Sequence, residues 1–281
     1  MSDDAMRSAI KNTWEAAAPG WAKWEEVIST SLKSVTDDLL DMAGIQVGHR
    51  VLDVACGAGD QTIRAARRVG AEGSVVASDI SGTMLEQVRK NVARAGMTNI
   101  LTAESAAEEL TGFEPAFDAA ISRLGLMLFP GPTAAVRAIG NLLEPGGRFA
   151  ALVFTTPDGN PFMARPMRIL LQHAAKQPPA AGQPGIFALG GEGVLEKLLS
   201  DAGLGDVRTK VVCASLNLPS ASDALHMIQQ AFGAYRAVVA DLDETARNAA
   251  WLDVASSLAD MENHHGFSTQ LEFIIGSGEK T

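Results

Sequence analysis

The sequence predicts a doubly wound α/β fold with a mostly parallel sheet. Between residues 51 and about 154, short β-rich runs alternate with helical patterns, which is the signature of βαβ units. A glycine turn at residues 57–59 follows the first of these runs, where such folds bind their ligands. The chain has 281 residues, of which 47% are hydrophobic. That is enough to bury one substantial core with an appended subdomain.

The alternating patterns between residues 51 and about 154 predict five strands and three helices. The strands are residues 51–55, 74–79, 99–103, 116–122 and 148–154. The helices are residues 60–69, 83–95 and 132–143. Gly96 follows the second helix and Pro145 follows the third. Both endings are chemically sensible, because glycine accepts the left-handed conformation that closes a helix and proline cannot continue one.

Helical patterns also flank this alternation. Residues 5–43 carry two of them, with Trp14, Trp21 and Trp24 around the Pro19-Gly20 pair, which usually breaks a helix. Asn160-Pro161 starts another helix, a proline-rich loop follows at 178–185, and a further helix spans 193–202.

The C-terminal part predicts an antiparallel edge pair of strands. Residues 206–214 and 269–275 have strand patterns, and helical patterns at 220–240 and about 243–262 lie between them. We therefore expect three parts: an N-terminal helical lid at 1–44, a core at 45–219 and 263–281, and a helical cap at 220–262.

Composition narrows the class of partner. A formal net charge of −10 argues against nucleic acid, which needs a basic surface. Residues 1–20 are neither signal nor anchor in composition, and no stretch approaches the ~20 apolar residues that span a bilayer. Cys56 and Cys213, the only cysteines, are too few for a disulfide framework or a zinc site. We expect a cytoplasmic enzyme without a metal, acting on a small molecule away from membranes.

The glycine turn lies in the segment VLDVACGAGDQ, residues 51–61. Backbone N–H groups at the following helix can face a ligand held close to the chain. A dinucleotide site would want a third glycine where Thr62 stands, and a phosphate-binding loop would want a lysine that is absent. Asp79, about twenty residues after the turn, suits ribose hydroxyls. The predicted ligand therefore has a ribose but no pyrophosphate.

Four ordered motifs carry a family resemblance: VLDVACGAGDQ, VVASDISGTMLEQVRKN, FDAAISRLGLMLF and LLEPGGRFAALVF. Together they resemble the class I S-adenosylmethionine-dependent methyltransferases, in particular the small-molecule branch of ubiquinone and menaquinone biosynthesis. The resemblance covers about residues 45–155. It implies a Rossmann-like sheet of seven strands with an antiparallel edge strand, and S-adenosyl-L-methionine as cofactor.

The resemblance also implies roles for single residues. Asp53, Gly57 and Gly59 would approach the methionine part of the cofactor, and Asp79 would bind its ribose hydroxyls. The side chains expected on the adenine are Ile80 and Met84, and those expected beside the reacting methyl are Ser122, through its backbone carbonyl, and Arg123.

Two positions depart from the family pattern. Ala55 stands where the family usually has glycine, which adds a methyl group to the turn. Ala106 stands where an Asp or Asn commonly binds the adenine amino group. Glu104, Glu108 or the backbone N–H of Ala107 would then supply that hydrogen bond.

Several residues have two open interpretations. Trp21 either staples the N-terminal helices to the core, or it lies over the cofactor or lines the acceptor pocket. An aromatic face suits a sulfonium cation. Cys56 is expected to be a small buried hydrophobe. His173 and Tyr235 are candidates for a catalytic base, although a nucleophile that is already ionised would need none.

The resulting hypothesis is methyl transfer by in-line displacement to O, N or C of a small organic acceptor. The alternative is a protein that binds S-adenosylmethionine on the same fold without transferring the methyl, as a binding module or in a cofactor-assisted rearrangement. Asp53, Gly57, Gly59 and Asp79 favour cofactor binding under both hypotheses.

Overall fold

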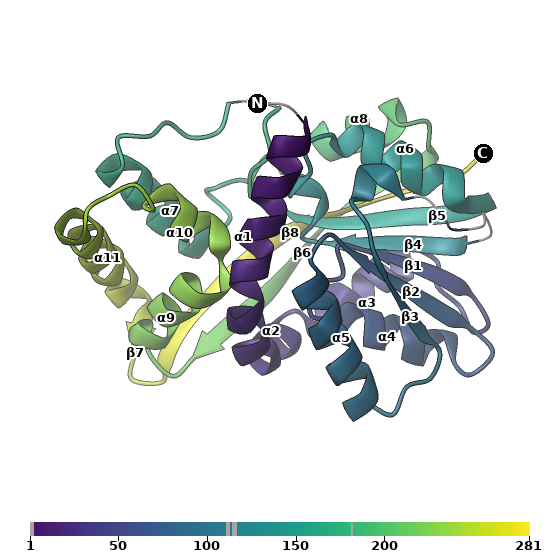
Figure 1. Cartoon of the computed structure of the whole chain (residues 1–281), viewed down its shortest axis with the longest axis horizontal. Coiled ribbons are helices and arrows are strands. Elements are labelled where there is room, and N and C mark those ends of the chain that lie inside the picture. The colour runs from purple at the N-terminus through teal and green to yellow at the C-terminus, as the bar shows by residue number, and fades with distance from the viewer. Residues whose placement is uncertain (1–2, 111–112, 114–116, 181) are drawn as a thin grey trace.

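The computed structural model describes residues 3–110, 113, 117–180 and 182–281 (Figure 1). In these residues the strands form one eight-stranded sheet in the order β3-β2-β1-β4-β5-β8-β6, with the short β7 paired only to β8. The strands are β1 (Arg50–Val54), β2 (Ser74–Asp79), β3 (Ile100–Glu104), β4 (Phe117–Arg123), β5 (Leu143–Phe154), β6 (Gly205–Leu218), β7 (Glu262–Asn263) and β8 (Gly266–Glu279). The first five run parallel, and β8 runs antiparallel to both β5 and β6. This confirms the predicted fold class and its antiparallel edge.

Helices cover both faces of the sheet: Figure 1 shows α6 and α8 above it and α3 and α4 below. The helices are α1 (Asp3–Lys23), α2 (Glu25–Ser31), α3 (Lys33–Met42), α4 (Asp60–Val69), α5 (Gly82–Arg94), α6 (Pro132–Leu142), α7 (Pro161–His173), α8 (Val194–Asp201), α9 (Ala221–Ala231), α10 (Gly233–Val238) and α11 (Glu244–Leu258), with 3-10 turns η1 (Ala107–Glu109), η2 (Leu126–Leu128) and η3 (Ala259–Met261). None of the described helices is both long and apolar enough to cross a membrane.

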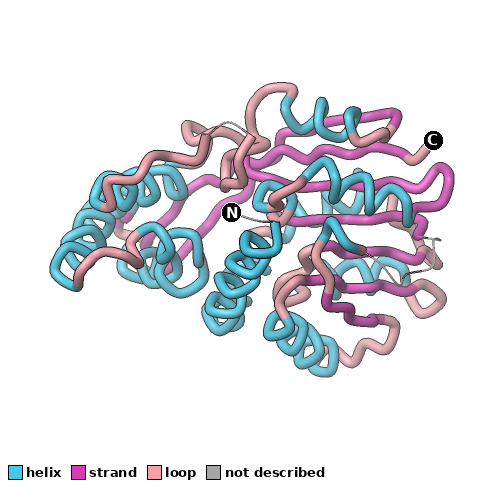
Figure 2. Tube along the Cα trace, turned by 45° about the horizontal axis from the view of Figure 1, so that its top comes forward, coloured by secondary structure: helices cyan, strands magenta, loops and turns pink. Residues whose placement is uncertain are grey.

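The seven expected strands are all present, with ends that differ by a few residues. Ala116, expected to begin the fourth strand, lies outside the described residues. Strands β6 and β8 are longer than expected because their pairing continues from Lys210 opposite Ile275 to Leu218 opposite Phe267. Figure 2 shows this pair of strands extending beyond the parallel strands toward α9 and α11. This pair of strands, called the β6–β8 ribbon below, thus reaches the helices that follow β6.

The prediction of two N-terminal helices divided at Pro19-Gly20 is wrong. Helix α1 runs through Pro19, and α2 and α3 follow as separate helices. Gly20 serves packing: a Cβ there would lie 1.9 Å from the carbonyl oxygen of Gln230 in α9. Its missing side chain therefore allows α1 and α9 to approach closely.

The segment expected as one helix at 220–240 forms two, α9 and α10, which meet at Phe232. The start of α10 approaches α1, because a Cβ on Gly233 would lie 2.8 Å from Cγ2 of Thr13. Helices α9 and α10 pack on α1, and α11 packs on α7. One apolar core joins these helices to the sheet, since Val254 of α11 and Ile121 of β4 belong to the same buried cluster.

Candidate active site

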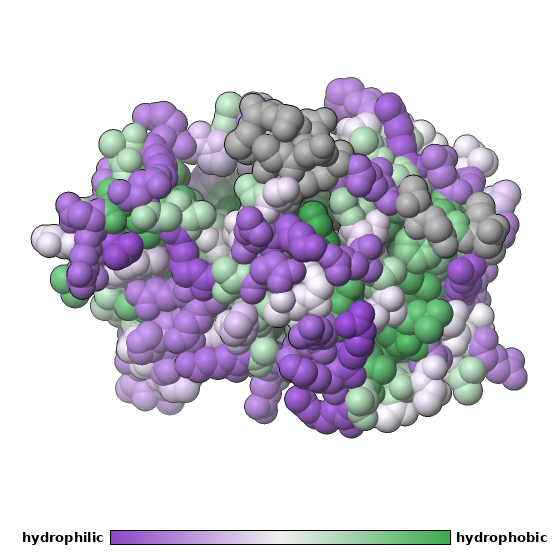
Figure 3. Space-filling model, viewed as in Figure 1, coloured by the Kyte–Doolittle hydropathy of each residue, from purple (hydrophilic) through white to green (hydrophobic). Residues whose placement is uncertain are grey.

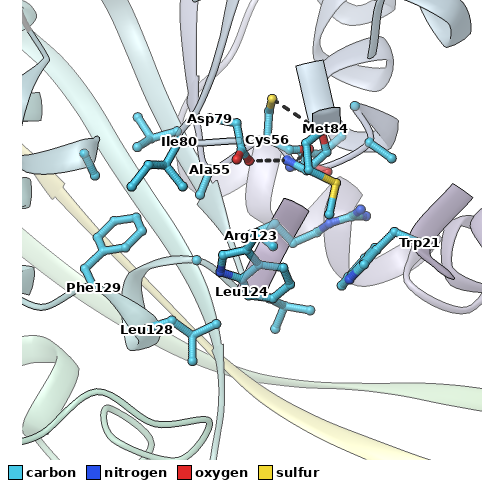
Figure 4. Close-up of a pocket in the computed structure, with 18 of the residues that line it drawn as sticks. Trp21, Ala55, Cys56, Asp79, Ile80, Met84, Arg123, Leu124, Leu128 and Phe129 are labelled. Carbon is cyan, nitrogen blue, oxygen red and sulfur yellow. Dashed lines mark hydrogen bonds between the residues drawn. The ribbon is translucent and has the colours of Figure 1, made fainter. Parts of the chain in front are cut away.

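A cavity of about 110 Å³ lies where the carboxyl ends of β1, β2 and β4 meet (Figure 4). Parallel strands deliver their following loops to the same edge of a sheet, which is why these ligand-binding loops converge. All but two of the residues expected to bind the cofactor line this cavity. They are Trp21, Ala55, Gly57, Gly59, Asp79, Ile80, Met84, Ala106, Ala107, Glu108 and Arg123.

The glycine turn is built from left-handed backbone. Gly57 has φ +54°, Gly59 has φ +88°, and Ala55 has φ +56°, a conformation that costs an L-residue about 1–2 kcal/mol. A Cβ on Gly57 would meet nothing within 4 Å, whereas a Cβ on Gly59 would lie 3.1 Å from Val88. Gly57 therefore leaves room on the cavity side, and Gly59 leaves room for α5.

Asp79, the last residue of β2, closes the turn with its side chain. Its Oδ2 accepts a hydrogen bond from the backbone N–H of Gly57 at 2.9 Å, and its Oδ1 accepts one from Ser81 at 2.9 Å. Burial raises the pKa of the Asp79 carboxyl to about 6, although these N–H groups lower it. The carboxylate is thus buried at the cavity wall and fixed in orientation.

Asp53 does not line the cavity. Its carboxyl is fully buried, accepting hydrogen bonds from Thr62 at 2.5 Å and from Gln61 at 3.4 Å. Burial raises its pKa to about 7, and the Thr62 bond opposes the rise. Asp53 therefore binds the first turn of α4, and its contact with the cofactor stays a prediction.

Arg123 lies at the cavity wall, but its guanidinium is engaged. It donates to Asp60 at 2.7 Å and to Thr36 at 2.8 Å. Burial favours a higher pKa for Asp60, but Arg123 and the hydroxyl of Ser29 outweigh it, so the pKa of Asp60 is lowered. This network ties α2 and α3 to the strand ends.

Ser122, expected to offer its carbonyl to the cofactor, is fully buried and lines neither cavity. It pairs with Ala151 inside the sheet, one residue short of the strand end where the cavity begins.

The loop after β3 supplies three more of the expected residues. Ala106, Ala107 and Glu108 line the cavity, and Glu108 Oε1 accepts the backbone N–H of Gly131 at 3.1 Å. Glu104, the alternative to Glu108, is paired with Lys11 of α1 and is not among the lining residues. Of the two carboxylates weighed for the adenine amino group, only Glu108 faces the cavity.

A second cavity of about 1090 Å³ adjoins the first. Its wall comes from α1, α7, the loop after α7, α9, α10 and the β6–β8 ribbon. It is mostly apolar, and the described lining residues include no Asp, Glu or His. The lining residues common to both cavities are Ile10, Trp14, Trp21, Ile28, Leu124 and Leu128. Leu124 has φ +63°, so a second strained residue stands at the strand ends.

Trp21 stands at the boundary of the two cavities. Its ring packs edge-on to Phe232 and tilted against Trp14, both at 6.4 Å between centroids. In Figure 4 it lies across the cavity from Phe129. Figure 3 shows mostly hydrophilic residues on the surface over α1 and α5. Trp14, Trp21 and Phe232 thus form an aromatic cluster at the boundary of the two cavities.

The two candidate bases are placed poorly for catalysis. Nε2 of His173 lies 2.8 Å from Asp253, where it joins α7 to α11, and His173 lines neither cavity. Tyr235 lines the second cavity, but its hydroxyl donates to the carbonyl of Met163 at 2.9 Å and burial raises its pKa. Cys56 is buried and burial raises the pKa of its thiol, as expected of a small hydrophobe.

Sequence reasoning missed Asp60 and Leu124. Asp60 directly follows the glycine turn, so an acidic residue in the first turn of α4 was the available signal. Nothing in the pattern around Leu124 indicates its positive φ or its place on both cavities.

The sheet order, the glycine turn and the carboxylate at the end of β2 define the class: this arrangement is that of the S-adenosylmethionine-dependent methyltransferases. The ubiE/COQ5 methyltransferase family model matches residues 3–173. The chain belongs to this family, whose cofactor is S-adenosylmethionine.

Similar proteins include curated relatives in sequence and solved structures that share the fold. The ubiquinone/menaquinone biosynthesis C-methyltransferase of Idiomarina loihiensis is 38% identical over 119 residues, which are 42% of this chain and 47% of that protein. The YcgJ protein from Bacillus subtilis superposes with a TM-score of 0.58 at 15% identity, covering 88% of this chain and 98% of that one. The cyclase SpnF has a TM-score of 0.51 at 18% identity, covering 88% and 80%. The chain spans about half the length of the curated relatives it matches.

Proposed function

We propose that this chain transfers the methyl group of S-adenosylmethionine to a carbon atom of an apolar small-molecule acceptor. One observation carries the proposal: the cavity at the glycine turn shares a wall with a larger apolar cavity. A donor held in the first and an acceptor held in the second would meet at that wall. The curated relatives are named C-methyltransferases, which favours carbon over oxygen or nitrogen.

The residues of the first cavity fit the cofactor. The open space beside Gly57 is where a close ligand can lie against the backbone. The Asp79 carboxylate can accept ribose hydroxyls, Ile80 and Met84 offer apolar contact to the adenine, and the N–H of Ala107 is a candidate donor to it. When bound, S-adenosylmethionine supplies a methyl group on a positively charged sulfur, already activated for displacement.

The chain itself aligns the reactants and excludes water. The four carboxylates of the first cavity already have partners. Asp79 accepts the backbone N–H groups of Gly57 and Ser81, and Asp60 binds Arg123. Glu108 accepts the N–H of Gly131, and Glu25 lies 3.8 Å from Arg94. The second cavity has no acid or histidine on its described wall. We therefore expect the acceptor to react in an ionised or otherwise electron-rich form, with its proton lost to solvent.

We also propose the division into parts that the sequence predicts. Residues 1–44 would act as a lid, because α1 contributes Trp14 and Trp21 to both cavities. Residues 220–262 would act as the acceptor cap, because Phe232 and Tyr235 line the second cavity. The core would be residues 45–219 and 263–281. We place the enzyme in the cytoplasm on its acidic composition and its two unpaired cysteines.

The test is incubation with S-adenosylmethionine carrying a ¹³C-labelled methyl group and a panel of apolar enols, phenols and amines. The expected result is S-adenosylhomocysteine formed in equal amount to a methylated product. The chemical shift of the label identifies its bond to carbon, oxygen or nitrogen. Tight cofactor binding with no S-adenosylhomocysteine from any acceptor would instead support the alternative of a binding module or a cofactor-assisted rearrangement.

A further inference from the structure

The indole nitrogen of Trp21 is a buried donor without a hydrogen-bond partner among the residues that the structure describes. Buried polar atoms in native proteins nearly always have partners, so an exception calls for a functional explanation. Trp24, three residues on, shows the usual state: its indole N–H donates to Gln230 at 3.0 Å. The two tryptophans differ in that Trp21 lines both cavities and Trp24 lines neither.

The surroundings of Trp21 offer its N–H no alternative. The other residues shared by the two cavities are Ile10, Trp14, Ile28, Leu124 and Leu128. None of their side chains carries an oxygen that could accept a hydrogen bond. The ring therefore carries an unpartnered donor in an otherwise apolar setting, and a turn of the ring into the cavity would present that donor to a ligand at this boundary.

The chemistry of the indole decides which ligand atom suits this donor. The N–H edge of the ring is electropositive and the ring face is electronegative. A sulfonium cation is attracted by the face and repelled by the edge. The N–H therefore suits an oxygen atom, and the second cavity, with about ten times the volume of the first, leaves space for the molecule that carries it.

We propose that the indole N–H of Trp21 hydrogen-bonds an oxygen of the acceptor and so positions its neighbouring nucleophilic carbon at the boundary of the two cavities. This inference rests on the proposed function. It defines the acceptor as a largely hydrocarbon molecule with a carbonyl, enol or phenol oxygen at the end that reaches Trp21. Trp21 is a positioning residue, since it exchanges no proton with the reacting carbon.

The segments around the second cavity bear on the size of this acceptor. The family match ends at residue 173, whereas the loop after α7, α9 and α10 form much of the cavity wall. The backbone N–H of Gly185 donates to Met127 at 3.0 Å and fixes that loop over η2. Segments outside the family match thus set the shape of the acceptor. The indole N–H of Trp21, which would bind the acceptor oxygen, lies on α1 within the family match.

The experiment is equilibrium dialysis of 9-fluorenone and fluorene, with S-adenosylhomocysteine present. The two probes differ by one carbonyl oxygen, which can only accept a hydrogen bond. Wild type is expected to bind fluorenone about fivefold more tightly than fluorene, and Trp21→Phe is expected to abolish this difference. Phenylalanine keeps an aromatic ring beside Trp14 and Phe232, and the affinity for fluorene should stay unchanged. Trp24→Phe is the matched control and should keep the difference.

Each other outcome overturns the inference. Equal binding of the two probes by wild type, or equal loss of both in Trp21→Phe, would show that the N–H recognises no oxygen. Failure of wild type to bind either probe would show that the cavity does not take apolar ligands. If Trp21→Phe weakens S-adenosylhomocysteine but spares fluorenone, the partner is the cofactor. Because no methyl transfer is measured, these outcomes are separate from the ¹³C test of the proposed function.

Discussion

The two cavities differ in how the chain builds them. The cavity at the strand ends uses backbone geometry and a few polar groups, and Gly57, Gly59 and Asp79 lie within 23 residues of the chain. The adjoining cavity uses apolar side chains drawn from α1, α7, α9, α10 and the β6–β8 ribbon. A cofactor that is the same throughout a family can be bound by fixed geometry. An acceptor that varies is better accommodated by side chains that change without disturbing the sheet.

The largest expected effect comes from Asp79→Ala. Loss of a charge-assisted hydrogen bond costs about 1.5–3 kcal/mol, so the affinity for S-adenosylhomocysteine should fall by about tenfold to a hundredfold in calorimetry. Fluorenone binding, which belongs to the second cavity, should change little. Asp253→Ala, on the exposed side of α11, serves as the control. Unchanged cofactor affinity in Asp79→Ala would remove Asp79 from the cofactor site.

Two glycine variants distinguish a role in cofactor binding from a role in folding stability within the turn. Both place alanine in left-handed backbone, which costs about 1–2 kcal/mol. Gly59→Ala also presses on Val88, so urea unfolding should show a larger loss of stability, about 2 kcal/mol or more. Gly57→Ala puts its methyl in open space, and we expect about a tenfold loss of cofactor affinity with the smaller loss of stability. If Gly59→Ala loses more cofactor affinity than Gly57→Ala, Gly57 does not face the ligand.

The two cavities should also differ in how ligand binding depends on pH. The raised pKa of Asp79, about 6, means that its carboxylate is protonated below that pH. We expect S-adenosylhomocysteine to bind about tenfold more weakly at pH 5 than at pH 7, since each pH unit below the pKa is a factor of ten. Fluorene binding should be flat, because no acid or histidine lines the second cavity among the described residues. Asp79→Asn should remove this pH dependence of binding. A pH dependence that remains in Asp79→Asn would come from another titrating group, and Asp53 would be the first candidate.

Folding stability should respond to pH in the opposite sense. The folded-state pKa values of Asp79, about 6, and Asp53, about 7, both lie above the ordinary 3.8. The folded protein therefore holds these protons more tightly than the unfolded chain. Their contribution to stability is complete below pH 3.8 and is lost as pH rises through 6 and 7. Urea unfolding of wild type and Asp79→Asn between pH 5 and 8 measures the contribution of Asp79 to the free energy of unfolding. If this free energy changes with pH in the same way in both proteins, Asp79 makes no such contribution.

A smaller effect is expected at the wall of the second cavity. Phe232 packs on both Trp21 and Tyr235, and aromatic pairs contribute about 0.5–1.5 kcal/mol. Phe232→Ala should raise the acceptor KM about fivefold and leave cofactor affinity within about twofold. Leu252→Ala, 69% exposed on α11, is the control. A change in cofactor affinity alone would contradict the separation of the two cavities.

The smallest expected effect is at Ala55. Its left-handed conformation costs about 1–2 kcal/mol, and glycine would relieve this at an entropic cost of about 0.5–1 kcal/mol. Ala55→Gly should therefore stabilise the protein by less than about 1 kcal/mol in urea unfolding. A loss of stability would show that the methyl group contributes packing worth more than its strain.

The sequence predicts the first cavity well because its determinants are local. Gly57, Gly59 and Asp79 stand at fixed places relative to strand ends, and the strands are recognisable from short apolar runs. Asp53 shows the limit of this reasoning. A residue within the motif can support the turn from behind, and its spacing does not reveal which way its side chain points.

The second cavity and the N-terminal helices were less predictable. Gly20 looks like a helix breaker in the sequence, but its role depends on Gln230, more than two hundred residues away. His173 is a candidate base in the sequence, but the fold places it outside the lining of both cavities. Apolar cavity walls carry no residue-specific spacing, so no pattern indicates that Trp21 packs on Phe232 or that Leu124 lines both cavities.

The central claim is that the donor and the acceptor meet at the wall shared by the two cavities. A crystal structure with S-adenosylhomocysteine and 9-fluorenone tests it most directly. We predict the ribose on Asp79, the cofactor sulfur directed toward Trp21 and Leu124, and the fluorenone oxygen within hydrogen-bonding distance of the Trp21 indole nitrogen. A sulfur directed away from this wall, or fluorenone bound outside the second cavity, would contradict the account.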